Sequence, residues 1–268
     1  MESDGTARPG RGPAGRPAGT DSEVRGKTAS AGQLRALLPD APSGFLTDAL
    51  DNPALVPDHV VLLLHNRAAS VPALVTIARR PEWTRLYDVK RGLVCHPSTP
   101  PTVARVFVHH LYWRDLADVA ADLRVHPTVR RRAEDLLVVR LGQLTLGERI
   151  ALARRAVRGL VEPLAELGEP AVLSALLANP RLVEGNVAAL ARSTETPGEI
   201  LDALVDDVRW GARLAVRKAL LHNPRTPIHA ALRILDRLSH QDLRAVQSET
   251  RIPRIVRLGA ERRLGLTP

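Results

Sequence analysis

The sequence predicts an all-α protein, and three observations support this prediction. From Gln33 onward, apolar residues recur at the spacing of amphipathic helices, and no stretch alternates strictly enough for a strand. The 268 residues include only three Trp, two Tyr and two Phe, so the core must consist of Leu, Val and Ala, a mix that favours helices over sheets. Helix-start signals also recur along the chain, which predicts many short helices of about 8 to 14 residues.

The expected helix starts follow from capping chemistry. In Thr196–Glu199 (TPGE), we expect Thr to cap, Pro to occupy the first helical position and Glu to close a capping box. Thr145–Glu148 (TLGE) has the spacing of a further capping box. The same Thr-Pro arrangement recurs at Thr99-Pro100 and Thr226-Pro227. We also expect Asp115 and Asp242 to cap short helices.

The chain is expected to divide into a tail and one helical domain. Residues 1–32 contain seven Gly and three Pro and almost no bulky apolar residue, which predicts a disordered tail. Residues 33–268 are predicted to form a single elongated domain. We expect its first half to span residues about 45–140 and its second half residues about 171–268, with bridging helices at about 141–170 between them.

An internal duplication is the strongest signal in the sequence. When the strip DNPALVPDHVVLLL from Asp51 is written above ANPRLVEGNVAALA from Ala178, the Asn-Pro pairs superpose, with Pro53 on Pro180. The same shift, which we call the repeat offset, places Trp83 on Trp210. A finer and equal spacing separates Pro53 from Pro97 and Pro180 from Pro224, and it matches the length of a helix-pair repeat. The sequence therefore predicts two duplicated halves built from helix pairs.

The stretch LDALVDDVRWGARLAVRKALLHNPRTPIHAAL (Leu201–Leu232) resembles the leucine-rich repeat variant, in which an apolar helix, an Asp and a VR pair precede Asn-Pro-x-Thr-Pro. The counterpart in the first half has diverged further, with His96 where the pattern expects Asn, and Gln33–Phe45 matches nothing. The resemblance implies a right-handed α-solenoid related to HEAT and armadillo proteins. Some members of that family carry an iron–sulfur cluster on an N-terminal cysteine motif, which this chain, with one Cys, does not have.

The composition excludes several classes of site. A single cysteine, Cys95, excludes a disulfide within one chain and any Cys-based metal or iron–sulfur site, and it fits a reducing compartment such as the cytoplasm. The longest aliphatic run, Val60–Leu64, is far too short to span a bilayer, so no membrane contact is expected. No phosphate-binding loop, metal-binding HExxH or nucleophile elbow occurs. We therefore expect no cofactor, no metal and no catalytic residues.

The basic residues are concentrated in two clusters, although GC-rich coding accounts for part of the excess of Arg. Arg124–Arg158 carries nine Arg against three acidic residues, and Arg251–Arg263 carries five against one. The repeat offset pairs Arg124 with Arg251 and Arg130 with Arg257, and Arg131 belongs to the first cluster. We expect both clusters to lie in the last helix of their half, on one side of the molecule and very roughly 30 Å apart. A basic ridge and an ordinary solvated surface are both consistent with this pattern.

The aromatic residues fall into two groups. Trp83 and Trp210 occupy equivalent positions, which predicts a shared role in core packing. By contrast, the repeat offset places Tyr112 and Trp113 on Ser239 and His240, so the repeat itself does not require aromatic residues there. Together with Arg114, these two residues have the composition of an interface hot spot. Local covering of the hydrophobic core is the alternative explanation.

These observations favour a non-catalytic scaffold whose curved helical surface binds a partner protein or peptide. A nucleic-acid-binding solenoid that uses the paired Arg clusters on phosphates is the alternative. A HEAT-like DNA glycosylase that uses Trp113 and Asp115 is a third, weaker hypothesis, because a capping role already accounts for Asp115.

Overall fold

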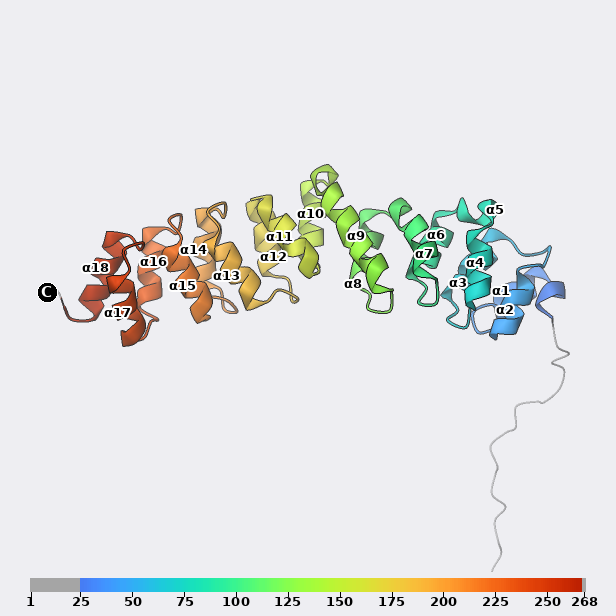
Figure 1. Ribbon diagram of the computed structural model, residues 1–268, viewed down its shortest axis with the longest axis horizontal. Coiled ribbons are helices and arrows are strands. Elements are labelled where there is room, and N and C mark those ends of the chain that lie inside the picture. The colour runs from blue at the N-terminus through green and yellow to red at the C-terminus, as the bar shows by residue number, and fades with distance from the viewer. Residues whose placement is uncertain (1–24, 267–268) are drawn as a thin grey trace, which may run out of the picture.

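The computed structural model describes residues 25–266, and within this range every regular element is a helix and no strand occurs (Figure 1). The N-terminal part comprises η1 (Gly26–Thr28), α1 (Ala31–Leu37), α2 (Ser43–Ala49), α3 (Pro57–His65), α4 (Val71–Ala78), α5 (Pro81–Thr84), α6 (Tyr87–Cys95), α7 (Pro101–Phe107), η2 (Val108–His110), α8 (Trp113–Ala121) and α9 (Pro127–Arg140). The remainder comprises η3 (Leu141–Gln143), α10 (Leu146–Ala153), α11 (Arg158–Glu166), α12 (Pro170–Leu177), α13 (Glu184–Arg192), α14 (Gly198–Asp206), α15 (Leu214–His222), α16 (Ile228–Leu235), α17 (His240–Ser248) and α18 (Arg254–Arg263).

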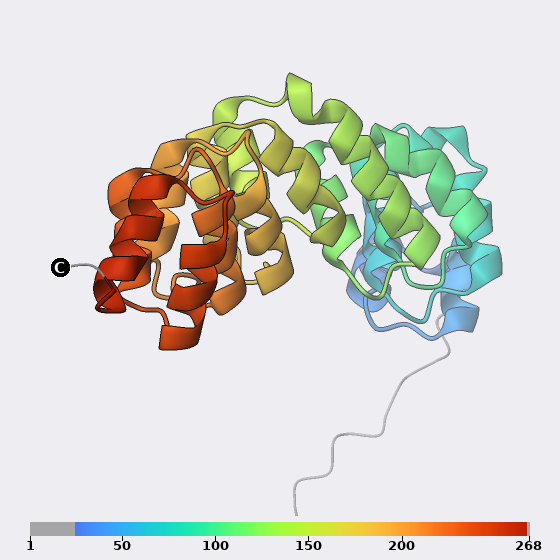
Figure 2. The same ribbon diagram turned by 60° about the vertical axis from the view of Figure 1, so that its left-hand side comes forward.

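The helices stand side by side in one elongated row that follows the order of the chain (Figure 1). Seen from another direction, the row bends into an arch, with the helices from the middle of the chain at its top (Figure 2). Such an arrangement leaves much of every helix pair in contact only with its neighbours along the row. The all-α prediction is confirmed.

Contacts between helices run along the row in two series. One links α1, α3, α6 and α8, while in the other α2 contacts α4 and α7 contacts α9. In the middle of the row, α9 contacts α11 and α10 contacts α12. The contacts continue from α11 through α13 to α15, and from α12 through α14 and α16 to α18. Helices α9 and α18 therefore belong to different series.

Helix starts recur at the repeat offset. Helix α3 begins at Pro57 and α13 at Glu184, and α8 begins at Trp113 and α17 at His240. The same spacing separates the starts of α1 and α11, α2 and α12, α4 and α14, α6 and α15, α7 and α16, and α9 and α18. The spacing thus extends to α1 and α2, where the comparison of residue types found no match.

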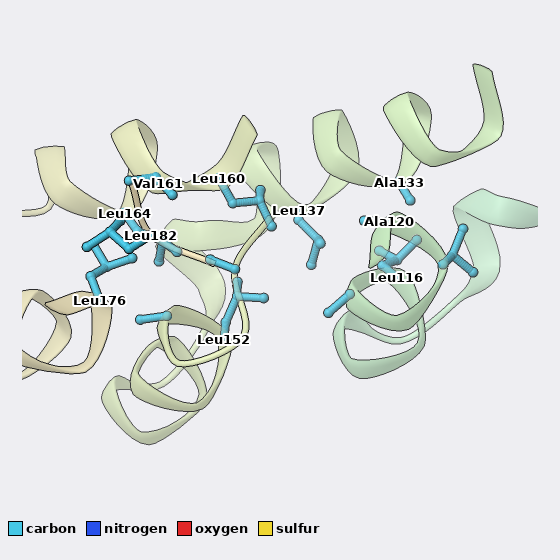
Figure 3. Packing of buried hydrophobic residues seen from close by; sticks show 14 of the residues in the cluster. Leu116, Ala120, Ala133, Leu137, Leu152, Leu160, Val161, Leu164, Leu176 and Leu182 are labelled. Atoms are coloured by element: carbon cyan, nitrogen blue, oxygen red, sulfur yellow. The ribbon is translucent and has the colours of Figure 1, made fainter. Parts of the chain in front are cut away.

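The core is continuous through the middle of the row. Leu137 of α9 lies between Leu160 of α11 and a group that includes Leu116 and Ala133 (Figure 3). The two equivalent tryptophans, Trp83 and Trp210, are 5% and 3% exposed, which confirms their predicted role in the core. An arginine side chain covers each indole ring, from Arg80 and Arg209 respectively.

Buried asparagines tie neighbouring helix pairs together. The Asn52 side-chain amide donates to the carbonyls of Gly26 at 2.7 Å and Ala29 at 2.8 Å, and its Oδ1 accepts the Ala54 N–H. Asn66, Asn179 and Asn223 make the same set of three bonds with their own neighbours. Each amide satisfies carbonyls at or just past the end of an earlier helix, so a buried polar group is stabilising here.

His96 performs part of the same role at the position where Asn was expected. Its Nε2 lies 3.1 Å from the carbonyl oxygen of Asn66, and its Nδ1 accepts the Ser98 N–H at 3.2 Å. Because Nδ1 accepts a bond, Nε2 carries the proton and the ring is neutral. Burial lowers the pKa of His96, which favours the same neutral form.

Arginines make a further set of ties. Arg80 donates to the carbonyl of Leu50 at 2.7 Å, and Arg237 donates to that of Val205 at 2.7 Å. Further bonds of this kind join Arg140 to Leu111, Arg181 to Arg155 and Arg225 to Thr194. Most of these carbonyls lie at helix C-termini, where a cation also compensates the helix dipole. The excess of Arg therefore has a structural use.

Several local predictions were wrong. Residues 25–32 do not belong to a tail, because Asn52 binds two of their carbonyls and Ala29 is buried; residues 1–24 lie outside the described range. Thr196 does not cap α14, since its hydroxyl donates backwards to the Leu190 carbonyl at 2.7 Å and the helix begins after Pro197. Asp115 and Asp242 each occupy the third position of a helix instead of the cap. The capping box at Thr145–Glu148 is confirmed.

Candidate interaction site

The predicted site residues fall at three places. Tyr112, Trp113 and Arg114 lie at the start of α8, and Arg130 and Arg131 lie in α9. The remaining three are Arg124 in the turn before α9, Arg251 in the turn before α18, and Arg257 in α18. The expectation that the clustered arginines would lie in the last helix of their half is therefore wrong for Arg124 and Arg251.

Two tyrosines form what we call the aromatic shelf, consisting of Tyr87 and Tyr112. Tyr112 precedes α8 and is 67% exposed, and its ring centroid lies 4.5 Å from that of Tyr87. The Tyr87 hydroxyl accepts the Tyr112 N–H at 3.1 Å and donates to the Asp115 carboxylate. Burial, reinforced by this bond to Asp115, raises the pKa of Tyr87 to about 12. The shelf is thus a neutral, hydrogen-bonded surface with one ring turned to solvent.

An ion pair beneath the shelf has a counterpart in the second half of the chain. Arg91 Nε lies 2.6 Å from Asp115 Oδ1, and at the equivalent positions Lys218 Nζ lies 3.0 Å from Asp242 Oδ1. The aromatic rings have no such counterpart, because Leu214 and Ser239 occupy the positions equivalent to Tyr87 and Tyr112. The ion pair is therefore part of the shared framework, and the aromatic pair is peculiar to the first half.

Trp113 has a structural role. Its indole is half-buried against the core, and Nε1 donates to Glu148 Oε1 at 2.9 Å, which joins α8 to the capping box of α10. The Thr145 backbone N–H, the Thr145 hydroxyl and this indole all donate to Glu148 and lower its pKa. Arg114 is exposed and lies over the indole, 5.4 Å from its centroid.

Arg130 and Arg131 line an open depression of about 750 Å³, which we call the basic hollow. Two arginines that sequence reasoning had not singled out complete it, Arg158 at the start of α11 and Arg181 after α12. Glu134 and the apolar side chains of Leu123 and Val157 also line it. Arg158 lay within the basic stretch seen in the sequence, but no sequence signal indicated that Arg181 would join it.

The other predicted arginines do not extend this surface. Arg124 binds Asp122 through Nε–Oδ1 at 2.9 Å and Nη2–Oδ2 at 2.7 Å, which compensates its charge. Arg257 is the counterpart of Arg130, yet α18 belongs to the other series of contacts. The expected basic ridge along one side of the molecule stays a prediction.

Other potential sites are sparse. Cys95 is partly buried, and burial raises the pKa of its thiol to about 11, so the sulfur is protonated and unreactive at neutral pH. Within residues 25–266, no three His, Cys, Asp or Glu side chains gather closely enough to hold a metal ion. Over the same range, every helix is too short or too polar to traverse a bilayer. Comparisons with known protein families, curated proteins and solved structures return no match.

Proposed function

We propose that this chain is a non-catalytic α-solenoid scaffold, built from two duplicated halves, that binds a partner protein or peptide. The common spacing of eight pairs of helix starts supports the duplication. The recurrent buried Asn ties support the proposed relation to the leucine-rich repeat variant, because three of them, Asn52, Asn179 and Asn223, stand in Asn-Pro pairs of the repeat. Helix pairs stacked in this way expose long surfaces suited to binding other proteins.

The aromatic shelf is the observation that carries the proposed binding role. Tyr112 is large, exposed and held in place by the ring and hydroxyl of Tyr87, so little side-chain entropy is lost when a partner contacts it. Arg114 adds an adjacent guanidinium group, and tyrosine and arginine are enriched among residues that dominate binding energy. The framework does not require the shelf, since the second half maintains the same ion pair without aromatic rings.

Affinity capture with matched variants tests this proposal. The full chain is immobilised, exposed to nuclease-treated lysate and compared with Tyr112→Ser, the residue that the counterpart position carries. Val208→Ser serves as the control, because Val208 is 97% exposed in a loop far along the chain. We expect a captured protein that Tyr112→Ser loses and Val208→Ser retains. Capture that is equal for all three proteins would contradict binding at the shelf.

Nucleic-acid binding remains the second candidate, and the basic hollow is the observation that favours it. Arg130 and Arg158 have no carboxylate partner among the described residues, so their charges are available to phosphates. The arginines of α18 belong to the other series of contacts and do not prolong the hollow into a track along which a polynucleotide could run. We therefore rank protein binding first.

A further inference from the structure

We infer that the basic hollow binds a phosphomonoester carried by a segment of the partner protein. This inference rests on the proposed scaffold function and adds the chemistry of a second contact. The hollow lies where α9 meets the start of α11, and the turn after α12 supplies Arg181. Its arginines thus come from three segments in the middle of the row.

The positive charge in the hollow is poorly compensated. Among the described residues, no carboxylate lies within ion-pairing distance of Arg130 or Arg158. Arg130 Nε is buried without a hydrogen-bond partner, as is Nε of its counterpart Arg257 outside the hollow. Arg131 reaches Asp135 only at 3.6 Å, on an exposed surface. The unpaired guanidinium charges of Arg130 and Arg158 therefore favour an anion that accepts hydrogen bonds from them.

The lone acid of the hollow forms no ion pair with these arginines. Burial raises the pKa of Glu134, and the charges of Arg131 and Arg130 partly offset that rise. The Glu134 carboxylate lies against Gly159, where a Cβ atom would collide with Oε2 and displace the side chain. Because Gly159 has no Cβ atom, α9 and α11 can pack closely with the Glu134 side chain between them. This close packing brings Arg130 and Arg158 to the same hollow.

The start of α11 adds a fixed positive potential. The helix spans nine residues from Arg158, and the preceding Val157 offers no side-chain cap to the N–H groups of the first turn. Such a terminus attracts anions, and here it opens into the same hollow as the four arginines. The combination of convergent guanidinium groups and an uncapped helix start suits a group with several acceptor oxygens.

Charge matching favours a phosphomonoester over a carboxylate. Arg130 and Arg158 provide two unpaired charges, and a phosphomonoester carries about −1.5 to −2 at neutral pH with three strong acceptor oxygens, whereas a carboxylate carries one charge. The residues that line the hollow favour a peptide over nucleic acid. Leu123 offers an apolar contact that is 82% exposed, and no aromatic side chain lines the hollow on which a base could stack. The expected ligand is a phosphorylated residue with an apolar neighbour.

Binding of phosphopeptides to the full chain tests the inference. The probe is a fluorescent peptide library with phosphoserine at its centre and Leu beside it, measured by anisotropy against the unphosphorylated library and a DNA oligonucleotide of equal charge. We expect the phosphorylated library to bind and Arg130→Gln or Arg158→Gln to weaken it about tenfold or more. Arg257→Gln is the matched control, because it alters the counterpart of Arg130 outside the hollow, and it should bind like the wild type.

Residue-level readout keeps the test informative if a variant is unstable. In the wild-type protein, titration with inorganic phosphate should shift the NMR signals of the Arg130 Nε–H and the Gly159 N–H, and not that of the Arg257 Nε–H. Equal binding of phosphorylated and unphosphorylated libraries, or tighter binding of the DNA, would overturn the inference. If the wild-type protein binds no phosphopeptide while Tyr112-dependent capture persists, the hollow is refuted and the scaffold proposal stands. If the wild-type protein binds the phosphopeptide but shows no Tyr112-dependent capture, the shelf is refuted.

Discussion

The side-chain amide of Asn179 donates to the carbonyl of Ala153 at 2.9 Å, across 26 residues of sequence. A second bond of 2.9 Å goes to the carbonyl of Ala156, and Oδ1 accepts the N–H of Arg181. The residue is fully buried, and removal of the amide would leave the Ala153 carbonyl with only a long bond of 3.4 Å from the Ala156 N–H. Asn179 thereby fixes the end of α10 against the end of α12.

Removal of this amide should be strongly destabilising. We expect Asn179→Ala to lower the free energy of unfolding by about 2 to 4 kcal/mol, because it leaves buried carbonyl groups without the donor that the amide provides. Asn186→Ala is the control, since Asn186 accepts only one long bond of 3.5 Å, from the Val183 N–H. Urea denaturation followed by circular dichroism measures both. Equal losses of unfolding free energy in the two variants would show that the buried Asn179 amide does not stabilise the fold more than an ordinary polar side chain.

His96 should make stability depend on pH. Burial lowers its pKa from the ordinary value of 6.5, so the unfolded chain binds the proton more readily than the folded one. The stabilisation is therefore present above pH 6.5 and is lost as the pH falls below it. In His96→Asn the side chain no longer titrates, so the difference between the melting temperatures of this variant and the wild type should grow as the pH falls from 7.5 to 5. A difference that stays constant over that range would contradict the neutral, buried imidazole.

The two types of tryptophan should respond differently to truncation. Trp210→Ala should cost about 3 to 5 kcal/mol of unfolding free energy, because a large, buried ring is lost. Trp113→Ala should cost less, since this indole is half-buried and its principal polar contact is with the partly exposed Glu148. Chemical denaturation of both variants checks the order. A larger loss of unfolding free energy in Trp113→Ala than in Trp210→Ala would contradict this order. It would show that the contact between α8 and α10 contributes more to stability than the buried Trp210 ring.

The arrangement of the arginine clusters predicts a modest dependence of DNA binding on salt. We expect weak binding of duplex DNA at low salt, and Arg130→Gln combined with Arg257→Gln should flatten the plot of log K against log salt by about one unit. The two residues belong to different series of contacts, so one duplex engages only one of them. Arg79→Gln with Arg85→Gln is the control. Flattening by about two units, with submicromolar binding at physiological salt, would favour the nucleic-acid function.

The sequence predicted what depends on local periodicity and on repetition. Helical spacing indicated the fold class, and the repeat offset placed Trp83 and Trp210 in the core. Cap positions were harder, because the Thr196 hydroxyl donates to the Leu190 carbonyl behind it instead of accepting an N–H of the helix ahead. The extent of the tail was wrong because Gly26 and Ala29 are held by Asn52, which is distant in the sequence.

The candidate sites depended on contacts that no sequence pattern contains. Tyr112 was identified as a copy-specific residue, but its partner Tyr87 is 25 residues away and became apparent only through their hydrogen bond. The basic hollow combines arginines of α9 and α11 with Arg181, which no local motif relates to them. Trp113 had the composition of an interface residue, yet the acceptor at Glu148 gives it a structural role.

Site-specific photo-crosslinking at the aromatic shelf tests the proposed scaffold function most directly. A benzophenone-bearing residue is introduced in place of Tyr112 in one protein and in place of Ser239, its counterpart in the second half, in another. After irradiation in nuclease-treated and untreated extracts, the adducts are separated and identified by mass spectrometry. The proposal predicts one recurrent protein adduct from position 112, insensitive to nuclease, and none of that species from position 239. Equal adducts from both positions, or a position-112 adduct that nuclease removes, would contradict it.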